Sequence, residues 1–238
     1  DGNKYLDITE QAGVVRYGYG LGLVTTDLNN DGWTDIYVAN DYSVPDFMFI
    51  NNKNGTFTDM TKQMTRQIEF YGMGVDVNDI NNDGLPDIGV VDMATDDHFM
   101  GKTLMTSMDV KGFWYYIDSL KYQYQYMFNA LQLNNGNNTF SNIANLAHVA
   151  KSEWSWASLF FDADNDGFKD YFISNGFKRY ARDNDFRNEM ERIRKENGGS
   201  VPMSMRKEMY EKMPSFKLSN YMGKNNGHIA FDNVAEEW

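Results

Sequence analysis

One nine-residue pattern occurs three times in this chain and limits the folds that are open to it. Each copy has Asp at its first, fifth and ninth positions, Asn or Asp at its third and Gly at its sixth. The copies occupy residues 27–35, 79–87 and 162–170. Alternate oxygen-bearing side chains can point inward around a cation, and the Gly makes the sharp turn that lets a backbone carbonyl join them.

Calcium is the ion that this pattern favours. Ca²⁺ takes about six to eight oxygen ligands in a loose shell, whereas Mg²⁺ demands an octahedral shell that few all-protein cages supply. We therefore predict about three calcium sites, one in each loop. The predicted ligands are the side chains at positions 1, 3, 5 and 9 and the carbonyl at position 7: Asp27, Asn29, Asp31, Trp33 and Asp35; Asp79, Asn81, Asp83, Leu85 and Asp87; Asp162, Asp164, Asp166, Phe168 and Asp170.

The residues around each loop exclude an EF-hand. That motif requires a Glu at position 12 and a helix on each side of the loop. Position 12 is here Val38, Val90 or Ile173, and the flanking runs are rich in β-branched and aromatic residues. Such runs predict strands, so we expect each loop to form the bend of a β-hairpin.

Two further signatures keep a constant distance from the loops. An aromatic residue followed two positions later by Asp or Asn occurs 22 residues before each loop and once more after the third; it starts at Tyr5, Phe57, Phe140 and Phe231. A segment ending in Asn-Asn starts 11 residues before each of the last three aromatics, at Asp46, Asn129 and Asn220. Each repeat unit therefore consists of four short strands.

Repeated four-stranded units at regular offsets are typical of a β-propeller. We predict an all-β chain of about three blades, preceded by one extra outer strand at Tyr5. Propellers close with about four to eight blades. Residues 1–238 are therefore interpreted as a single segment of a larger propeller, completed by the remainder of that propeller or by other subunits.

Length variation is confined to the connection between the second and third strands of each unit. The first loop Asp precedes the third-strand signature by 19, 50 and 58 residues in the successive units. We predict insertions at about 96–127 and 178–218, the second of them largely helical because its Met and other apolar residues recur at helical spacing. Both insertions should lie on the face opposite the acidic loops.

The three loops resemble those of the FG-GAP/VCBS repeat family, which includes the calcium-binding propeller repeats of integrin α subunits and of bacterial surface proteins similar to cartilage acidic protein. The loops match the family motif at every ligand position. The Gly-Ala-Pro element of the family is absent, and its Phe-Gly survives only as Tyr19-Gly20 and Tyr71-Gly72. The resemblance implies a secreted or cell-surface protein, for example one lipid-anchored at a bacterial outer membrane, with a role in adhesion or assembly.

Composition limits the partners. The net charge is −12, and the loops hold ten of the carboxylates, so no basic surface is available for nucleic acid. The chain has no Cys, and no apolar run approaches the ~20 residues of a transmembrane helix. We expect the ligand to be a protein or a glycan, bound on the face opposite the calcium loops.

An aromatic cluster in the first insertion is the candidate ligand site. It comprises Trp114, Tyr115, Tyr122, Tyr124 and Tyr126. These side chains could stack on a sugar or a peptide, although packing between blades is the other interpretation. No catalytic motif accompanies them. We therefore expect a non-enzymatic protein, the alternative being a polysaccharide lyase or glycosidase on a calcium-stabilised propeller.

Overall fold

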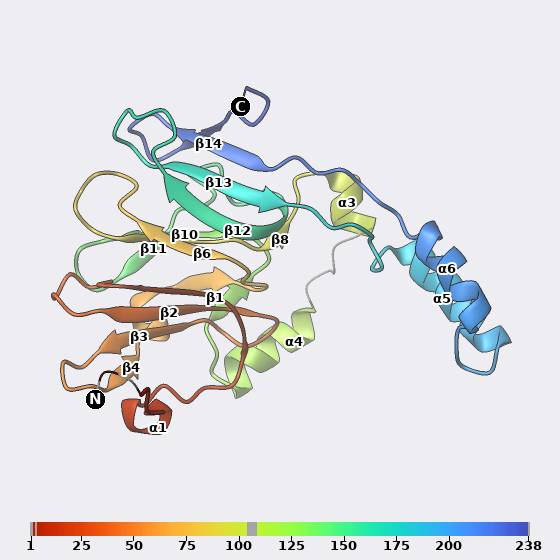
Figure 1. Ribbon diagram of the computed structural model, residues 1–238, viewed down its shortest axis with the longest axis horizontal. Coiled ribbons are helices and arrows are strands. Elements are labelled where there is room, and N and C mark those ends of the chain that lie inside the picture. The colour runs from red at the N-terminus through yellow and green to blue at the C-terminus, as the bar shows by residue number, and fades with distance from the viewer. Residues whose placement is uncertain (1, 3, 104–108, 238) are drawn as a thin grey trace.

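Three antiparallel sheets lie side by side in the computed structural model, which describes residues 2, 4–103 and 109–237 (Figure 1). The first blade has the order β1 (Tyr19–Thr26), β2 (Asp35–Asp41), β3 (Phe47–Asn51), β4 (Phe57–Asp59). The second has β6 (Val75–Asn78), β7 (Asp87–Val90), β10 (Ala130–Asn134), β11 (Phe140–Asn142). The third has β12 (Glu153–Phe161), β13 (Asp170–Asn175), β14 (Tyr221–Asn225), β15 (Phe231–Asn233). A short strand, β8 (Met93–Ala94), pairs with the edge of β12 that β13 does not occupy.

The strand boundaries follow the signatures. The third strand of every blade ends at the first Asn of the Asn-Asn pair. The fourth strand begins at the aromatic residue of the repeated signature, which is Phe57, Phe140 or Phe231. The acidic loops join the first and second strands of each blade. The predicted fold class, a mainly β propeller segment with two partly helical insertions, is confirmed.

The innermost strands of the blades, β1, β6 and β12, pass very close to one another. A Cβ atom on Gly22 would lie 2.7 Å from the carbonyl oxygen of Met73, and one on Gly74 would lie 2.6 Å from that of Trp156. Only Gly permits this approach. The equivalent residue on β12 is Ala157, which is exposed, so β12 has no such neighbour on its far side within the described residues.

The hydrophobic core consists of two clusters between adjacent blades. Leu28 and Ile88 belong to the cluster between the first and second blades, and Ile80 and Tyr171 belong to the one between the second and third. Leu28 and Ile80 occupy position 2 of their acidic loops. Each of these two loops is therefore anchored by a side chain buried against the next blade.

A hydrogen bond ties each of these loops to the following blade. The amide Nδ2 of Asn134, at the end of β10, donates to the backbone oxygen of Leu28 at 3.0 Å. Asn225 donates in the same way to the oxygen of Ile80 at 2.7 Å. The side-chain amide of Asn51, the equivalent residue of the first blade, donates to Thr34 of its own blade and to no other described residue, which places its inter-blade position at an open edge.

The insertions lie on the side of the sheets away from the acidic loops (Figure 1). The first contains α3 (His98–Thr103), α4 (Val110–Trp114) and a π-helix (Tyr115–Ser119); β9 (Tyr124–Tyr126) then pairs in parallel with β5 (Gln67–Glu69). Residues 104–108 of the predicted insertion lie outside the described residues. The second forms a projecting arm of α5 (Asn184–Glu196) and α6 (Met203–Lys212).

The structure differs from the expected extra outer strand at Tyr5. Residues 4–8 form no strand, although α1 (Thr9–Ala12) follows them as α2 (Thr61–Met64) follows β4. The Asx turn of the signature is nevertheless present, because Asp7 accepts the backbone N–H of Thr9 at 3.0 Å. An outer strand needs a third strand to pair with, and none of the described residues provides one here.

Two buried carboxyl groups face each other in the first blade. Asp46 accepts a hydrogen bond from the Tyr37 hydroxyl at 2.5 Å and one from the backbone N–H of Asn40. Glu69 is 1% exposed, and its carboxyl contacts that of Asp46. Among the described residues no N–H or O–H donor reaches either Glu69 oxygen. Burial, with Asp46 alongside, raises the pKa of Glu69 well above its ordinary value, which favours the protonated form of this carboxyl.

Replacing Asn134 by Ala should destabilise the protein by about 1–3 kcal/mol, because the change leaves the buried oxygen of Leu28 without its donor. The matched control is Asn51→Ala, which removes the equivalent local contacts but no inter-blade bond. Urea unfolding measures both. Equal losses for the two variants would contradict the inter-blade role.

Glu69→Gln should stabilise the protein increasingly as the pH rises above the ordinary pKa of a Glu carboxyl. Because the pKa of Glu69 is raised in the folded state, this group adds to the free energy of unfolding at a pH below its ordinary pKa. That contribution is lost as the pH rises through the pKa of Glu69 in the folded protein. Gln keeps a donor toward Asp46 at every pH. Thermal melting of both proteins over a series of pH values tests the prediction, and a difference that does not change with pH would disprove it.

Candidate metal centres

The three acidic loops are held by the same backbone hydrogen bonds. The first Asp accepts the N–H groups of positions 5 and 6; for Asp162 these are Asp166 at 3.1 Å and Gly167 at 3.0 Å. Asp27 and Asp79 accept the equivalent pairs. The loop backbone is therefore wrapped around the first carboxylate in every copy.

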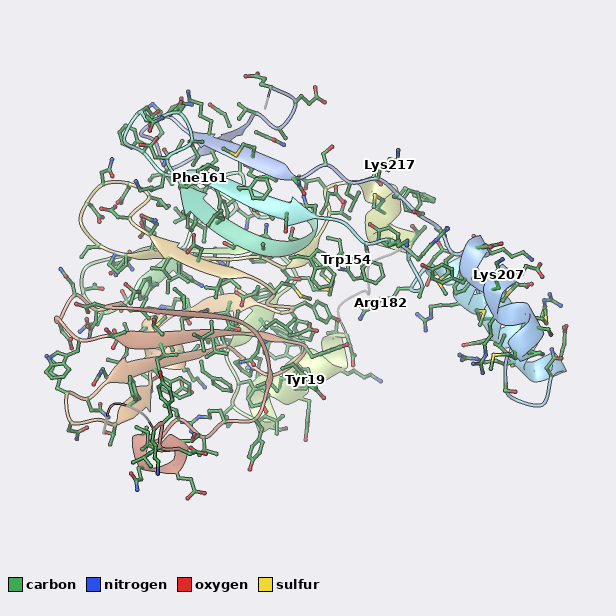
Figure 2. The ribbon with its side chains drawn as sticks, in the orientation of Figure 1. Tyr19, Trp154, Phe161, Arg182, Lys207 and Lys217 are labelled. Atoms are coloured by element: carbon green, nitrogen blue, oxygen red, sulfur yellow. The ribbon has the colours of Figure 1, made fainter. Side chains whose placement is uncertain are left out.

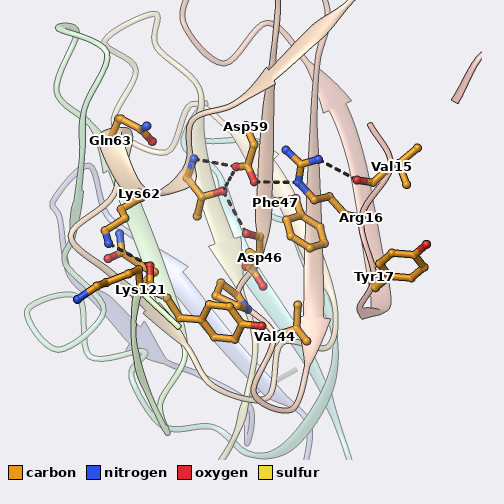
Figure 3. A pocket seen from close by; sticks show the side chains of 14 residues that line it. Val15, Arg16, Tyr17, Val44, Asp46, Phe47, Asp59, Lys62, Gln63 and Lys121 are labelled. Atoms are coloured by element: carbon orange, nitrogen blue, oxygen red, sulfur yellow. Dashed lines mark hydrogen bonds and ion pairs between the residues drawn. The ribbon is translucent and has the colours of Figure 1, made fainter. Parts of the chain in front are cut away.

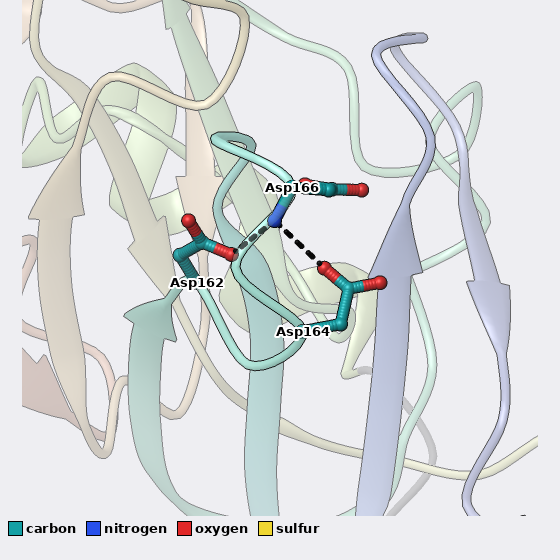
Figure 4. Close-up of side chains that lie close together, drawn as sticks. All are labelled: Asp162, Asp164 and Asp166. Carbon is teal, nitrogen blue, oxygen red and sulfur yellow. Dashed lines mark hydrogen bonds between the residues drawn. The ribbon is translucent and has the colours of Figure 1, made fainter.

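Positions 3 and 5 repeat in the same way. In the third loop, Asp164 accepts the N–H of Asp166 at 3.2 Å (Figure 4). Asp166 in turn accepts the N–H of Phe168 at 2.9 Å. One oxygen each of Asp162, Asp164 and Asp166 all lie within 4.8 Å of one another. A divalent cation brings oxygens to this kind of separation, so the residues fit the predicted ion.

The backbone reaches this shape through left-handed residues. Gly167 at position 6 has φ +94°, and Asn165 at position 4 has φ +60°. The equivalent Asn and Gly of the other two loops also have positive φ. Gly and Asn are the residues that adopt this region most readily, which is why both recur at these positions.

The first two loops carry Asn in place of Asp at position 3. The amide of Asn29 donates to Asp31 at 3.1 Å, and that of Asn81 donates to Asp83 at 2.9 Å. The amide oxygen accepts the N–H of position 5, as the Asp164 carboxylate does in the third loop. An amide oxygen is also a calcium ligand, so all three loops offer the same donor atoms.

The ninth residue connects each loop to its sheet. Asp35, Asp87 and Asp170 are fully buried, and one carboxylate oxygen of each accepts the N–H of loop position 2. The other oxygen accepts the N–H of the Asn that ends the third strand, as in Asn134 to Asp87 at 2.8 Å. Burial raises the pKa of Asp87 to about 6 and raises that of Asp35.

Lysines reach two of the loops, a feature that the loop motif did not predict. Lys224 of β14 lies 2.5 Å from Asp164, and its ammonium holds the pKa of that carboxyl below its ordinary value. Lys53 lies 3.3 Å from Asp31 of the first loop. These contacts place a cation beside carboxylates that otherwise repel each other, so a bound metal ion would compete with the ammonium groups.

The predicted aromatic ligand residues fall into two groups of contacting rings. Trp114, Tyr124 and Tyr126 all pack on Phe113. Tyr115 and Tyr122 both pack on Tyr116, and Trp114 and Tyr115 are about half exposed. Apart from Tyr122, none of the predicted ligand residues lines the cavity beside the first blade that contains Arg16 and Lys62.

Tyr122 instead lines a cavity of about 500 Å³ beside the first blade (Figure 3). Arg16 lies on one side of it, 3.6 Å from Asp59, and Lys62 donates to the backbone oxygen of Lys121 on the other. Tyr122 also stacks on Tyr116. The cavity thus combines basic and aromatic side chains from the N-terminal segment, the first blade and the first insertion.

The geometry can now be compared with known proteins. The FG-GAP-like repeat family matches residues 27–90, which span the first two acidic loops and the strands between them. The chain contains FG-GAP-like repeat sequence. This finding confirms the predicted resemblance, and the third loop extends the same hydrogen-bond pattern beyond the matched residues.

One curated relative also matches part of the chain. Cartilage acidic protein 1 of Mus musculus is 34% identical over 83 residues, which cover 34% of this chain and 13% of the relative. The chain thus matches only a small part of that protein's length. Among the described residues, no helix combines the length and the apolar character needed to cross a membrane.

Lys224→Met should raise the calcium affinity of the third loop about thirtyfold, because a single positive charge about 4 Å from a divalent ion costs about 2 kcal/mol even in water. The measurement is calorimetric titration with Ca²⁺ in a protein that also carries Asp27→Asn and Asp79→Asn, so that only the third loop is intact. Lys53→Met in the same background is the control, since Lys53 reaches only the first loop. Indistinguishable affinities in the two variants would refute competition by Lys224.

Proposed function

We propose that this chain is a calcium-stabilised segment of a β-propeller that binds a protein or a glycan outside the cell and catalyses no reaction. The supporting observation is the set of six backbone hydrogen bonds that recurs in all three loops. Loops without a common ligand would have no reason to keep one geometry at every oxygen-bearing position.

The ions would be held by the residues that the motif predicts. In each loop these are the side chains at positions 1, 3, 5 and 9 and the carbonyl at position 7, which belongs to Trp33, Leu85 or Phe168. A bound Ca²⁺ would neutralise the negative charge of the loop carboxylates. The chain itself orients the carboxylates through its backbone N–H groups and excludes water from the ninth residue by burial.

The arc of three blades would be extended by further blades, from the remainder of a larger propeller or from other subunits. Leu21 and Leu23 on the first inner strand are 57% and 66% exposed, and Leu159 and Phe161 on the last are 48% and 38% exposed. In the middle blade, Met73, which corresponds to Leu21, is 4% exposed. Exposed apolar side chains on the two outer flanks therefore match positions that a neighbouring blade covers.

The ligand would bind on the face that carries the insertions. The projecting arm is closed at its base by the backbone bond from Tyr180 to Pro214 and by Arg179, which donates to Met213. Ile193 and Met209 are the buried residues of its two helices. This arm and the aromatic residues Trp114, Tyr115, Tyr122, Tyr124 and Tyr126 are the proposed binding elements.

A location at the cell surface or in the extracellular space fits this function, because calcium outside cells is plentiful enough to fill loops of modest affinity. The mouse relative carries the name cartilage acidic protein 1, and the present chain has a net charge of −12. Attachment to a bacterial outer membrane through a lipid is one form of this proposal.

Removing calcium should lower the melting temperature by many degrees. Three loops, each filled at about ten times its dissociation constant, stabilise the folded state by about 4 kcal/mol through binding linkage, a large part of the stability of a domain. Melting is compared in calcium, in EGTA and in EGTA with excess calcium restored. The triple variant Asp27→Asn, Asp79→Asn, Asp162→Asn should no longer respond. An unchanged midpoint in EGTA would defeat the proposal.

A further inference from the structure

A second cavity lies where the innermost strands of the blades begin, on the face opposite the acidic loops. Its volume is about 250 Å³, and it is walled by β1, β12, the end of β2 and the segment that follows β13. The residues that concern its chemistry are Asp41, Trp154, Trp156, Phe177, Tyr180 and Arg182. Figure 2 shows Trp154 and Arg182 next to each other on this side, where the base of the arm meets the blades.

Stacked aromatic rings form one wall of this cavity. Phe177 stacks on Trp154 with ring centres 4.7 Å apart and on Trp156 with centres 6.3 Å apart. Trp156 is 44% exposed, and its indole N–H is fixed by a hydrogen bond to the carbonyl of Gly176 at 2.6 Å. A ring that is held in place and still half exposed offers a flat apolar face to a ligand.

Two polar groups of the wall lack partners. The indole N–H of Trp154 and the hydroxyl of Tyr180 make no hydrogen bond within the described part of the chain. Both side chains are almost fully buried, at 5% and 1% exposure. Buried donors and hydroxyls are nearly always paired, so these two groups leave the side of the wall behind the rings incompletely satisfied.

One positive and one negative side chain complete the lining. The guanidinium of Arg182 lies 5.7 Å from the Trp154 ring. Asp41 accepts the backbone N–H of Tyr42, and burial raises its pKa while the charge of Arg182 opposes that rise. No ion pair within 4.0 Å joins Asp41 to Arg182 or to any other described residue. Both groups therefore keep hydrogen-bonding capacity for a ligand.

We propose that this cavity binds one pyranose ring of a neutral glycan. A pyranose presents an apolar face of C–H groups that can lie on Trp156, and a rim of hydroxyls that both donate and accept. Those hydroxyls can donate to the Asp41 carboxylate and accept from Arg182. The proposal specifies the glycan option of the proposed function and rests on it.

The charges favour a neutral glycan over the alternatives. Asp41 and Arg182 balance each other within the cavity, and the chain as a whole carries a net charge of −12. An acidic polysaccharide would be repelled by that net charge. A peptide would need a match between its own charges and this fixed pair, whereas each hydroxyl of a sugar pairs with either group.

The test is calorimetric titration of the calcium-loaded protein with maltotriose, cellotriose, mannotriose and galactotriose. At least one of these neutral trisaccharides should bind, and Trp156→Ala and the nearly isosteric Asp41→Asn should each weaken that binding about tenfold, which corresponds to 1.4 kcal/mol. Phe99→Ala, which removes an exposed aromatic side chain outside this cavity, is the control. Melting curves verify that the variants fold.

Three results would overturn the proposal: no binding of any neutral trisaccharide, unchanged binding by both cavity variants, or loss of binding in Trp114→Ala with Trp156→Ala unaffected. The last result would place the site in the first insertion. The calcium-dependent shift in melting temperature is recorded on the same samples. If that shift is present without sugar binding, the sugar site fails while the calcium-stabilised propeller stands; if the shift is absent, the proposed function itself fails.

Discussion

The buried carboxylate at the ninth position of each acidic loop is the contact on which the rest of the structure depends. Through one oxygen it holds the loop backbone, and through the other it holds the end of the third strand, as Asp87 does with Ile80 and Asn134. One side chain therefore joins the metal-binding part of the repeat to its sheet. Because the group is fully buried, its hydrogen bonds are protected from water and its geometry is constrained.

The same constraint extends from blade to blade. The backbone N–H of Asn134 donates to the Asp87 carboxylate, and its side-chain amide donates to the backbone oxygen of Leu28 in the previous loop. Asn225 repeats this arrangement one blade later. Loop, strand end and adjacent blade thus form a continuous series of hydrogen bonds. In this account, calcium bound in a loop stabilises the packing between blades as well as the hairpin that contains it.

The strands could be predicted closely from the sequence because each signature contains a side chain that makes a recurring backbone bond. Asp46, Asn129 and Asn220 accept the N–H of the residue five positions after the ninth loop Asp. Asp59, Asn142 and Asn233 form the turn after the fourth strand. Because these hydrogen bonds join residues at constant positions within each repeat, the side chains that make them recur at fixed spacings in the sequence.

Features that depend on distant segments were beyond prediction. The parallel pairing of β5 with β9 and the addition of β8 to the third sheet have no local signature. Lys224 reaches Asp164 across 60 residues, and the aromatic cavity assembles Asp41, Trp156 and Arg182 from three parts of the chain. Trp154 is buried, whereas Trp156 is 44% exposed and lines that cavity.

A crystal structure of the protein grown with Ca²⁺, with anomalous scattering recorded to locate the ions, tests the central claim most directly. The account predicts one anomalous peak in each of the three loops, about 2.3–2.6 Å from the oxygens at positions 1, 3, 5 and 9 and from the carbonyl at position 7. Loops that keep their present hydrogen bonds with no peak at their centres, in crystals containing millimolar calcium, would contradict it.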